Sequence, residues 1–336
     1  GMKLMSDGVQ KSAGEKLQRT LSVVTSNKVV AILTGMLITM IIQSSGATTV
    51  MVVTFVNAGL ISLAQSAGVI FGANIGTTIT AWIVSIFGFN FKISAFAVPV
   101  VGLGYFLSIF KKRKYQNIGE AIMGFGLLFL GLSGLSSVFT PDQLGWMLNI
   151  KGTGASAIIL GFLIGIVVTA LLHSSSAFSA IVITMAYNGL ISWELAAAMT
   201  LGSNVGSTVD SIMASMGTSA NGRRAALIHV MFNLFGTIVV LCFLKPFLDL
   251  VMFITPGQEN SNIAIRISML HTVFNIITTV VMTPLSGKLV KIAEFLIKDD
   301  PSEKKKVFKL EFIEHSGKEN VATYIIQAEK AIADMT

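Results

Sequence analysis

The sequence is poor in charge, in cysteine and in proline, and each shortage narrows the class of protein. Charged residues make up 12% of the 336 residues and hydrophobic residues 53%, whereas soluble domains usually carry about a quarter charged residues. Between Val29 and Phe110 the only formally charged residue is Lys92. Uncharged runs of this length predict membrane-spanning helices, because a soluble domain has too little interior to bury them.

The single cysteine, Cys242, excludes an intrachain disulfide. Residues 1–28 lack an apolar core followed by a small-residue cleavage site, so no cleavable signal peptide is predicted. Proline is rare (6) and glycine abundant (31), as in membrane helices that use small residues for close packing. The net charge of +7 would suit nucleic acid, but the basic residues cluster beside predicted helix ends. Positive-inside topology explains that clustering, so no nucleic acid partner is predicted.

Two packets of hydroxyl-bearing residues interrupt the apolar runs, and they lie 130 residues apart. The first packet is Gln43-Ser44-Ser45-Gly46-Ala47-Thr48-Thr49, and the second is His173-Ser174-Ser175-Ser176-Ala177-Phe178-Ser179. The same offset matches Gly35 with Gly165, Thr39 with Thr169, and Gly72, Asn74, Gly76 and Thr78 with Gly202, Asn204, Gly206 and Thr208. The sequence therefore predicts an internal duplication in which each copy carries one polar packet.

Each packet is expected at the tip of a helical hairpin. The limbs on either side of Gln43, within residues 29–58, are about 13 residues or ~20 Å long, too short to cross a hydrocarbon layer of about 30 Å. A re-entrant hairpin with its tip buried in protein fits better, and the second hairpin is expected at 155–188. Each hairpin precedes a polar-centred helix, at 62–88 and 193–216, that we expect to unwind in its middle.

The predicted fold is an all-α integral membrane protein with two inverted-topology repeats, each containing a re-entrant helical hairpin and a broken transmembrane helix. The first repeat is expected at 1–117, with its first helix truncated at the N-terminus, and the second at 118–250. A final transmembrane helix is expected at 251–287 and a charged cytoplasmic helical tail at 288–336. Ordinary spans are expected at 93–110, 118–139, 225–244 and 263–284.

The basic residues predict which ends of these elements face the cytoplasm. If Lys111 to Lys114 is cytoplasmic, strict alternation places the basic arm at 11–28, Arg223 with Arg224, and the tail from Lys288 on the same side. The connectors near Asp142 and Glu259, which carry little positive charge, then fall outside. The first hairpin enters from the cytoplasm and the second from outside. Inverted repeats with broken helices are typical of secondary transporters, whose sites lie at the midplane.

The hairpin tips suit an oxyanion, because the unpaired N–H groups at the start of each returning helix carry partial positive charge. The candidate anion-binding residues are Gln43, Ser44, Ser45, Thr48, His173, Ser174, Ser175 and Ser176. No Lys or Arg accompanies them, so the neutralising charge is expected from co-transported cations. The predicted breaks offer the oxygens that sodium prefers, and the candidate sodium ligands are Asn74, Gly76, Thr77, Thr78, Asn204, Gly206, Ser207, Thr208 and Asp210.

Gln-Ser-Ser followed some thirty residues later by Gly-x-Asn-Ile-Gly-Thr-Thr, all duplicated, resembles the type II sodium/phosphate cotransporter family. Two His-x-x-x-Asn helices, His229 to Asn233 and His271 to Asn275, resemble that family too. The resemblance covers residues 1–284. It implies sodium-coupled uptake of inorganic phosphate across the cell membrane, phosphate near the tips and sodium near the breaks. It implies no cofactor other than sodium, and a tail that begins a cytoplasmic PhoU-like domain.

Two departures from the family pattern concern the tips. Gly46 stands where the family often has a third serine, which removes one hydroxyl. His173 replaces the glutamine of the second packet, and an imidazole can substitute for an amide as donor or acceptor but can also titrate near neutral pH.

Simpler roles remain open for these residues. Serines in membrane helices often only bond neighbouring helices, and the Asn-x-Gly-Thr breaks have an alternative role as flexible packing points. Asp210, costly inside a membrane, has an alternative role as the structural partner of a hydroxyl or a histidine. His229 and His271 have an alternative role as partners of their own neighbours.

Other functions are weighed against phosphate symport. A symporter of sulfate or a dicarboxylate is the closest, although a dicarboxylate would call for an Arg in the site. An anion channel is a further alternative, and a membrane serine hydrolase lacks a suitable motif, so the protein is predicted not to be an enzyme. Phosphate, sodium and membrane lipid are the expected partners, and a homodimer is left open.

Overall fold

The computed structural model describes residues 1, 3–5, 7–8, 11, 27–90, 96–110, 112–138, 154–255 and 262–299. The chain divides into two compact units, Gly1–Ile297 and Lys298–Thr336, and only Lys298 and Asp299 of the second unit are described. Several expectations lie outside the described residues. They concern most of the basic arm at 11–28, Lys92, Lys111, the connectors near Asp142 and Glu259, and the tail from residue 300.

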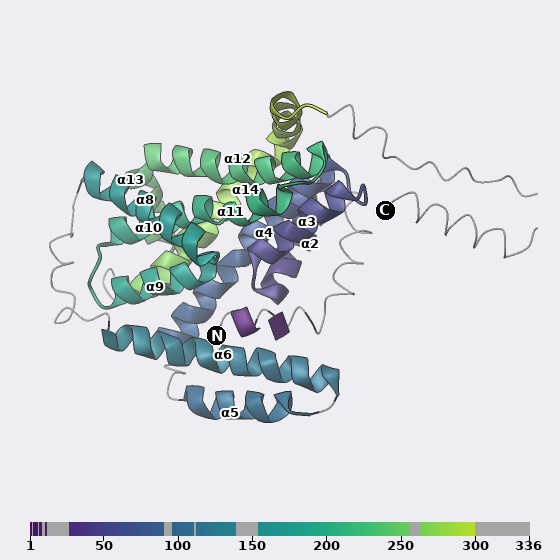
Figure 1. Cartoon of the computed structure of the whole chain (residues 1–336). Helices are drawn as coiled ribbons and strands as arrows, with labels where there is room; N and C mark the ends of the chain where they lie inside the picture. Colours follow the sequence, from purple (N-terminus) through teal and green to yellow (C-terminus); the bar gives the residue numbers. More distant parts are fainter. Residues whose placement is uncertain are drawn as a thin grey trace, which may run out of the picture. The chain divides into compact units, whose positions relative to one another are not determined.

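Every regular element among the described residues is helical (Figure 1). The helices are α2 (Lys28–Ile42), α3 (Ser45–Asn57), α4 (Leu63–Ile83), the π-helix η1 (Val84–Asn90), α5 (Ala97–Ser108), α6 (Arg113–Val138), α8 (Ala155–Leu172), α9 (Ser175–Tyr187), α10 (Trp193–Gly206), α11 (Val209–Ser215), α12 (Ala220–Cys242), α13 (Leu244–Ile254) and α14 (Ile263–Leu296).

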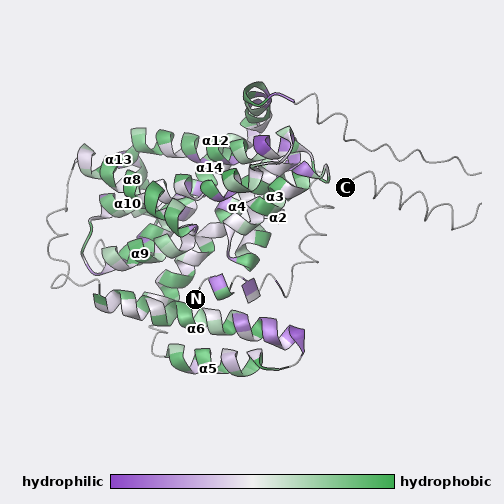
Figure 2. Ribbon diagram, in the orientation of Figure 1, coloured by the Kyte–Doolittle hydropathy of each residue, from purple (hydrophilic) through white to green (hydrophobic). Residues whose placement is uncertain are grey.

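Five of the described helices are long and apolar enough to cross a membrane. They are Leu63–Phe89, Arg113–Val138, Ala155–Leu172, Ala220–Cys242 and Ile263–Leu296. The span expected at 93–110 is represented by α5, which has only 12 residues. Figure 2 shows α5, α8 and most of α6 as hydrophobic along their length, with hydrophilic residues concentrated at one end of α6.

Two helices expose equivalent stripes of large apolar side chains. α2 exposes Val29, Leu33, Leu37 and Ile41, and α8 exposes the four residues at an offset of 130, which are Ile159, Leu163, Val167 and Leu171. Their exposed fractions run from 44% to 75%. A stripe of large apolar side chains four residues apart is one face of a helix, and such a stripe is stable only beside an apolar medium.

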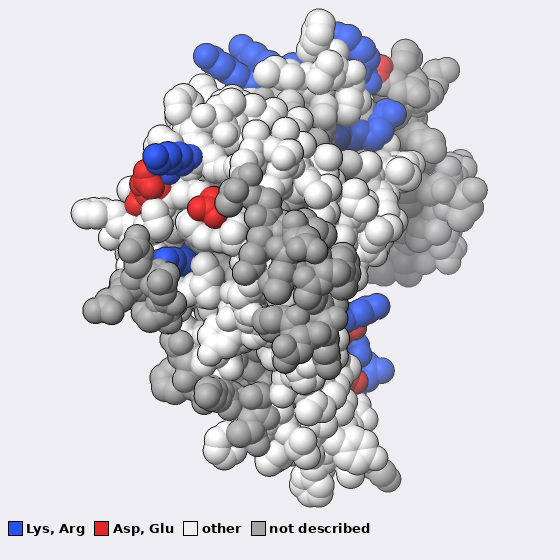
Figure 3. Space-filling view, turned by 90° about the vertical axis from the view of Figure 1, so that its left-hand side faces the viewer, with Lys and Arg blue, Asp and Glu red and all other residues white. Residues whose placement is uncertain are grey.

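Charge is sparse on the described surface as well. On the face shown in Figure 3, Lys and Arg side chains lie at the upper and right-hand edges and, beside acidic side chains, on the left, and much of the remaining described surface is uncharged. At the N-terminus, Lys11 pairs with Glu120 of α6 at 2.8 Å. The hydrogen bond and negative charge of Glu120 raise the pKa of Lys11.

At each predicted tip the structure has a helix–turn–helix unit with a left-handed residue in the turn. α2 ends at Gln43, whose φ is 60°, and α8 ends at His173, whose φ is 50°. The next residue of each turn, Ser44 or Ser174, is extended and caps the returning helix. One left-handed residue followed by an extended cap reverses the chain within two residues, so the tips are tight. α8 has 18 residues, longer than the limb length expected from the first hairpin.

The helix after the first hairpin is not broken where we expected. α4 continues from Leu63 to Ile83 through Asn74 and Thr78, so the predicted unwinding at that place is wrong. The second copy is interrupted, because α10 ends at Gly206 and α11 begins at Val209. The last helix, α14, continues past Lys288, where a tail was expected to begin, and ends at Leu296.

Glycines hold each hairpin against the helix that follows it. A Cβ on Gly72 of α4 would lie 1.8 Å from the carbonyl oxygen of Ile32 in α2, and a Cβ on Gly202 of α10 would lie 2.1 Å from that of Phe162 in α8. Residues 72 and 32 correspond to 202 and 162 at the offset of 130. The two copies therefore pack their helices by the same contact.

Gly72→Ala and Gly202→Ala are each expected to destabilise the protein strongly, because backbone cannot move away from the added methyl group as a flexible side chain can. The change should lower the detergent melting temperature and the yield of monodisperse protein. Gly287→Ala in α14 is the matched control, since a Cβ there has nothing within 4 Å. Equal melting temperatures for all three variants would show that the contacts at Gly72 and Gly202 are not needed for stability.

Candidate functional site

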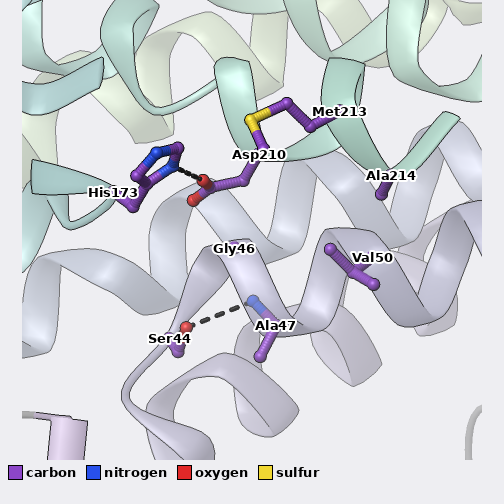
Figure 4. A pocket seen from close by; sticks show the side chains of 8 residues that line it. All are labelled: Ser44, Gly46, Ala47, Val50, His173, Asp210, Met213 and Ala214. Carbon is purple, nitrogen blue, oxygen red and sulfur yellow. Dashed lines mark hydrogen bonds and ion pairs between the residues drawn. The ribbon is translucent and has the colours of Figure 1, made fainter. Parts of the chain in front are cut away.

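The two hairpin tips meet at one small polar cavity. Its volume is about 30 Å³, and that leaves room for about one ordered water. The lining residues are Gln43, Ser44, Ser45, Gly46, His173, Ser174, Ser175, Ser176, Ser207 and Asp210. A wider pocket of about 500 Å³ shares four of them, Ser44, Gly46, His173 and Asp210 (Figure 4). Seven of the eight predicted anion-binding residues thus lie together, although they come from packets 130 residues apart.

The first serine of each packet is committed to capping its helix. Ser44 Oγ accepts a hydrogen bond from the Ala47 backbone N–H at 3.1 Å, and Ser174 Oγ accepts one from Ala177 at 3.1 Å. These bonds start α3 and α9 at the cavity, with the positive ends of both helices directed at it.

The second serine of each packet is available to a ligand. Within the described residues the hydroxyls of Ser45 and Ser175 take part in no hydrogen bond, and both residues line the cavity. Both side chains are nearly buried. From the sequence, Ser44 and Ser45 are both predicted to bind the anion. In the structure Ser44 caps a helix, whereas the hydroxyl of Ser45 is free to bind a ligand.

A residue that the sequence analysis missed, Thr80 of α4, connects the two tips. Its Oγ1 donates to Gln43 Oε1 at 2.9 Å and accepts from Ser176 Oγ at 3.3 Å. Gln43 also donates through Nε2 to the carbonyl oxygen of Met40. The offset of 130 was the available signal, because it matches Thr80 with Asp210.

His173 and Asp210 form the corresponding contact in the other copy. His173 Nδ1 lies 2.8 Å from Asp210 Oδ1 (Figure 4), so the alternative in which Asp210 pairs with a histidine agrees with the structure. At the offset of 130, Gln43 with Thr80 and His173 with Asp210 are equivalent pairs. One pair has no carboxylate, and the other has Asp210, the one carboxylate among the described residues that line the cavity.

The carboxylate of Asp210 explains the glycine in the first packet. A Cβ on Gly46 would lie 2.5 Å from Asp210 Oδ2, much closer than two unbonded heavy atoms approach. The equivalent of Gly46 is Ser176, which meets the smaller Thr80 without a clash. The pairs Gly46 with Asp210 and Ser176 with Thr80 are therefore complementary in size across the two copies.

Thr48 lies away from the cavity. Its side chain is fully buried, accepts from Thr39 Oγ1 at 2.9 Å and donates to the carbonyl oxygen of Ser44 at 3.0 Å. The contacts of Thr48 hold α2 against α3, and the residue is absent from the cavity lining.

The candidate sodium ligands do not form one group around the cavity. Only Ser207 and Asp210 line it. Asn74 and Thr78 donate to carbonyl oxygens of their own helix, as do Ser207 and Thr208. Gly76 and Gly206 pack against the backbone of α2 and α8. The side-chain oxygen of Asn204 accepts a hydrogen bond from His271 Nε2 at 2.9 Å.

The described residues contain no group of three or more His, Cys, Asp or Glu side chains that is arranged to hold a metal ion. Such groups suit transition metals and divalent cations, whereas sodium accepts neutral carbonyl, amide and hydroxyl oxygens. The oxygens near the helix interruption at residues 207–208 are of that neutral kind.

The fold and the cavity define a class of protein, a multi-pass helical membrane protein with a polar site between two internal copies, as in transporters. The Na+/Pi-cotransporter family matches residues 1–137 and 147–286. The chain belongs to this family, and the resemblance drawn from its motifs is confirmed. Membership in a transporter family also favours the prediction that the protein is not an enzyme.

Individual relatives carry different names. The chain is 29% identical over 304 residues to the uncharacterized protein YqeW of Bacillus subtilis, covering 88% of this chain and 94% of that protein. It is 28% identical over 302 residues to the putative inorganic phosphate export protein YjbB of Escherichia coli, covering 90% of this chain and 54% of YjbB. The chain thus spans about half the length of YjbB.

A shorter match is to the rat sodium-dependent phosphate transport protein 2B, 33% identical over 131 residues, which covers 38% of this chain and 18% of that protein. No solved structure matches the chain.

Proposed function

We propose that this protein is a secondary active transporter that carries inorganic phosphate together with sodium and binds phosphate between the two hairpin tips. One observation carries the proposal. Two capped helix N-termini, with a free serine hydroxyl on each, meet at a cavity that no Lys or Arg lines in the described part of the chain.

Chemistry favours a phosphate oxyanion at this cavity. Hydroxyls and backbone N–H groups donate hydrogen bonds to anionic oxygens, and helix N-termini add partial positive charge. A site without a fixed Lys or Arg holds a doubly charged anion only moderately and can release it. The carboxylate of Asp210 adds a negative charge, so a cation must accompany phosphate, and sodium is the cation in the names of the family and of the rat relative.

We propose sodium sites along α4 at Asn74, Gly76, Thr77 and Thr78, and around the interruption between α10 and α11 at Asn204, Gly206, Ser207, Thr208 and Asp210. Both regions adjoin a hairpin, so a cation there can change the position of a tip. The repeated contacts at an offset of 130 support two copies of one unit, and alternating access follows if the copies have inverted topology with re-entrant hairpins.

The proposed location is the cell membrane, with the tail cytoplasmic. Arg224 at the start of α12 donates to the carbonyl oxygen of Ile297, just past the end of α14. Lys28 lines a pocket with Thr283 and Ser286 of α14. These contacts bring three groups of basic residues, at 28, 223–224 and 288–291, to one end of the helices, which supports a cytoplasmic placement of that end.

Reconstitution into liposomes tests the function. Labelled phosphate should accumulate inside when sodium is higher outside, should not accumulate with choline in place of sodium, and should be displaced by excess phosphate but not by sulfate or succinate. Accumulation that is equal with choline would contradict sodium coupling. Stronger competition by sulfate or succinate than by phosphate would assign the site to another oxyanion.

Phosphate export is the second candidate, because YjbB is named as a putative exporter. Symport runs in the direction set by the ion gradient, so liposomes preloaded with phosphate and sodium should release phosphate into sodium-free medium. Release that ignores the sodium gradient would favour export by another driving force.

A further inference from the structure

Among the described residues six buried side-chain oxygens have no hydrogen-bond partner, and five of the six belong to α4, α12 and α14. These five are Thr77 Oγ1, Asn233 Oδ1, Thr237 Oγ1, Asn275 Oδ1 and Thr279 Oγ1. None of their residues is more than 7% exposed. A buried polar group without a partner destabilises a protein, so five such groups in one region require an explanation.

The first step is to show that α14 places two of these oxygens beside α4. Trp82 Nε1 donates to Thr272 Oγ1 at 2.9 Å, and Gly68 and Phe71 line a pocket with Thr283 and Ser286. α4 and α14 therefore run antiparallel in a register that pairs 82 with 272 and 71 with 283. The same register places Asn275 level with Ile79, next to Thr78, and Thr279 level with Ile75, next to Asn74.

The second step is to show that α12 crosses α14 at the same level. A Cβ on Gly236 would lie 2.6 Å from the methyl group and from the hydroxyl oxygen of Thr278. Gly236 lies between Asn233 and Thr237 along α12, and Thr278 lies between Asn275 and Thr279 along α14. The crossing point therefore has an unpaired amide oxygen and an unpaired hydroxyl on each helix.

The amide nitrogens of Asn233 and Asn275 are used, and their oxygens have no partner. Asn233 Nδ2 donates to the carbonyl oxygen of His229 at 3.1 Å, and Asn275 Nδ2 donates to that of His271 at 2.8 Å. Each amide therefore has a nitrogen that is already bonded and an oxygen that is not. Thr77, Thr237 and Thr279 also differ from buried threonines such as Thr184 and Thr200, whose hydroxyls bond the carbonyl four residues earlier.

We infer that these oxygens form a binding site for a monovalent cation at the junction of α4, α12 and α14, with ligands from Asn233, Thr237, Asn275, Thr279 and Thr77. Neutral amide and hydroxyl oxygens suit sodium, whereas divalent ions call for carboxylates. The inference rests on the proposed sodium-coupled function and adds two helices to its cation sites. The sequence analysis had assigned His229, Asn233, His271 and Asn275 no site.

The junction is connected to the phosphate cavity by the two histidines. His271 Nε2 lies 2.9 Å from Asn204 Oδ1, just before the interruption at residues 207–208, and His229 Nδ1 lies 2.9 Å from Ser211 Oγ, just after it. Between these two anchors lie Ser207 and Asp210, which line the cavity. A cation that fixes α12 relative to α14 thus fixes both sides of the interruption and the cavity residues on it.

Thr237→Val with Thr279→Val tests the site, because it removes two hydroxyl ligands and keeps the shape of both side chains. The double variant should raise the sodium concentration for half-maximal phosphate uptake by about ten-fold or more, the scale of losing a partner of a metal site. In purified protein without phosphate, sodium should raise the melting temperature of the wild type above that in choline, and this rise should be smaller in the variant.

Two further variants make the result interpretable. The variant Thr237→Ser with Thr279→Ser keeps both hydroxyls and should keep the sodium dependence of uptake. If the valine variant folds poorly, the serine variant replaces it in comparisons of stability. Thr184→Val is the matched control, because Thr184 is equally buried and its hydroxyl bonds its own helix.

The outcomes distinguish failure of the cation site from failure of the proposed function. Sodium-dependent uptake by the wild type with the same sodium dependence in the valine variant would overturn the cation site and leave the function intact. Wild-type uptake that is independent of sodium would overturn the function itself. Oxygens that bind only water would give a valine variant with unchanged sodium dependence and an unchanged sodium effect on melting temperature, which also overturns the site.

Discussion

Replacing Ser45 or Ser175 with alanine is expected to raise the phosphate concentration for half-maximal uptake by about 10-fold or more. Each hydroxyl is free of other partners and lines the cavity between the tips. A hydrogen bond to a charged group contributes about 1.5–3 kcal/mol, and each 1.4 kcal/mol corresponds to about a factor of ten in affinity. Because the two serines come from equivalent tips, both single changes should weaken phosphate binding.

Alanine substitutions at two other serines distinguish an effect on phosphate binding from an effect on stability. Ser44→Ala removes a helix cap, so it should lower the free energy of unfolding by about 1 kcal/mol. Ser62 caps α4 through Gln65 N–H and does not line the cavity, so Ser62→Ala should affect stability and leave the phosphate affinity unchanged. Unchanged uptake kinetics in both Ser45→Ala and Ser175→Ala would contradict a site shared by the tips.

Gly46→Ser is expected to weaken phosphate binding by about ten-fold or more, although it adds a hydroxyl that the family often has. The new Cβ would occupy the place of the Asp210 carboxylate and would separate it from His173. Losing a hydrogen bond to a charged group costs about 1.5–3 kcal/mol, and the displaced carboxylate would enter the space that phosphate needs.

A second change should reverse this effect. Gly46→Ser with Asp210→Thr reproduces the Ser176 and Thr80 pair of the other copy, so phosphate affinity at saturating sodium should rise clearly above that of Gly46→Ser. Asp210→Thr alone is the control, and labelled phosphate binding is the measurement. A double variant that binds phosphate no better than Gly46→Ser would show that the Asp210 carboxylate itself is required. That result would contradict the account in which the sizes of residues 46 and 210 are complementary.

The sequence predicted the positions of the two turns closely, because their signal is local. A polar packet within an apolar run marks a tip, and α2 with α3 and α8 with α9 turn at Gln43 and His173. The duplication also predicted which residues meet, since the free serines of both tips line one cavity. The family membership followed from the same motifs.

The break in the first copy was predicted wrongly, since the asparagine and glycine in α4 are compatible with a continuous helix. Asn74 bonds a carbonyl of its own helix, and Gly76 allows α2 to approach closely. At the interruption in the second copy, Ser207 and Thr208 both bond carbonyls three residues earlier, and the Thr208 N–H bonds the carbonyl of Val205. Such tightened bonds end an α-helix.

The sequence alone did not predict the contacts between distant helices. The composition of α4 does not show that Thr80 reaches Gln43, or that Asp210 lies against Gly46, because both contacts depend on how the two copies pack. The sequence also does not show that the side-chain oxygens of Asn233 and Asn275 are unpaired, because that depends on which donors lie around them in the fold.

Equilibrium dialysis of labelled phosphate against purified protein in sodium buffer tests the central claim, that one phosphate is held by both tips. The wild type should bind one phosphate per chain, and Ser45→Ala and Ser175→Ala should each weaken that single binding event. Two phosphates per chain, with each variant losing only one of them, would contradict a shared site.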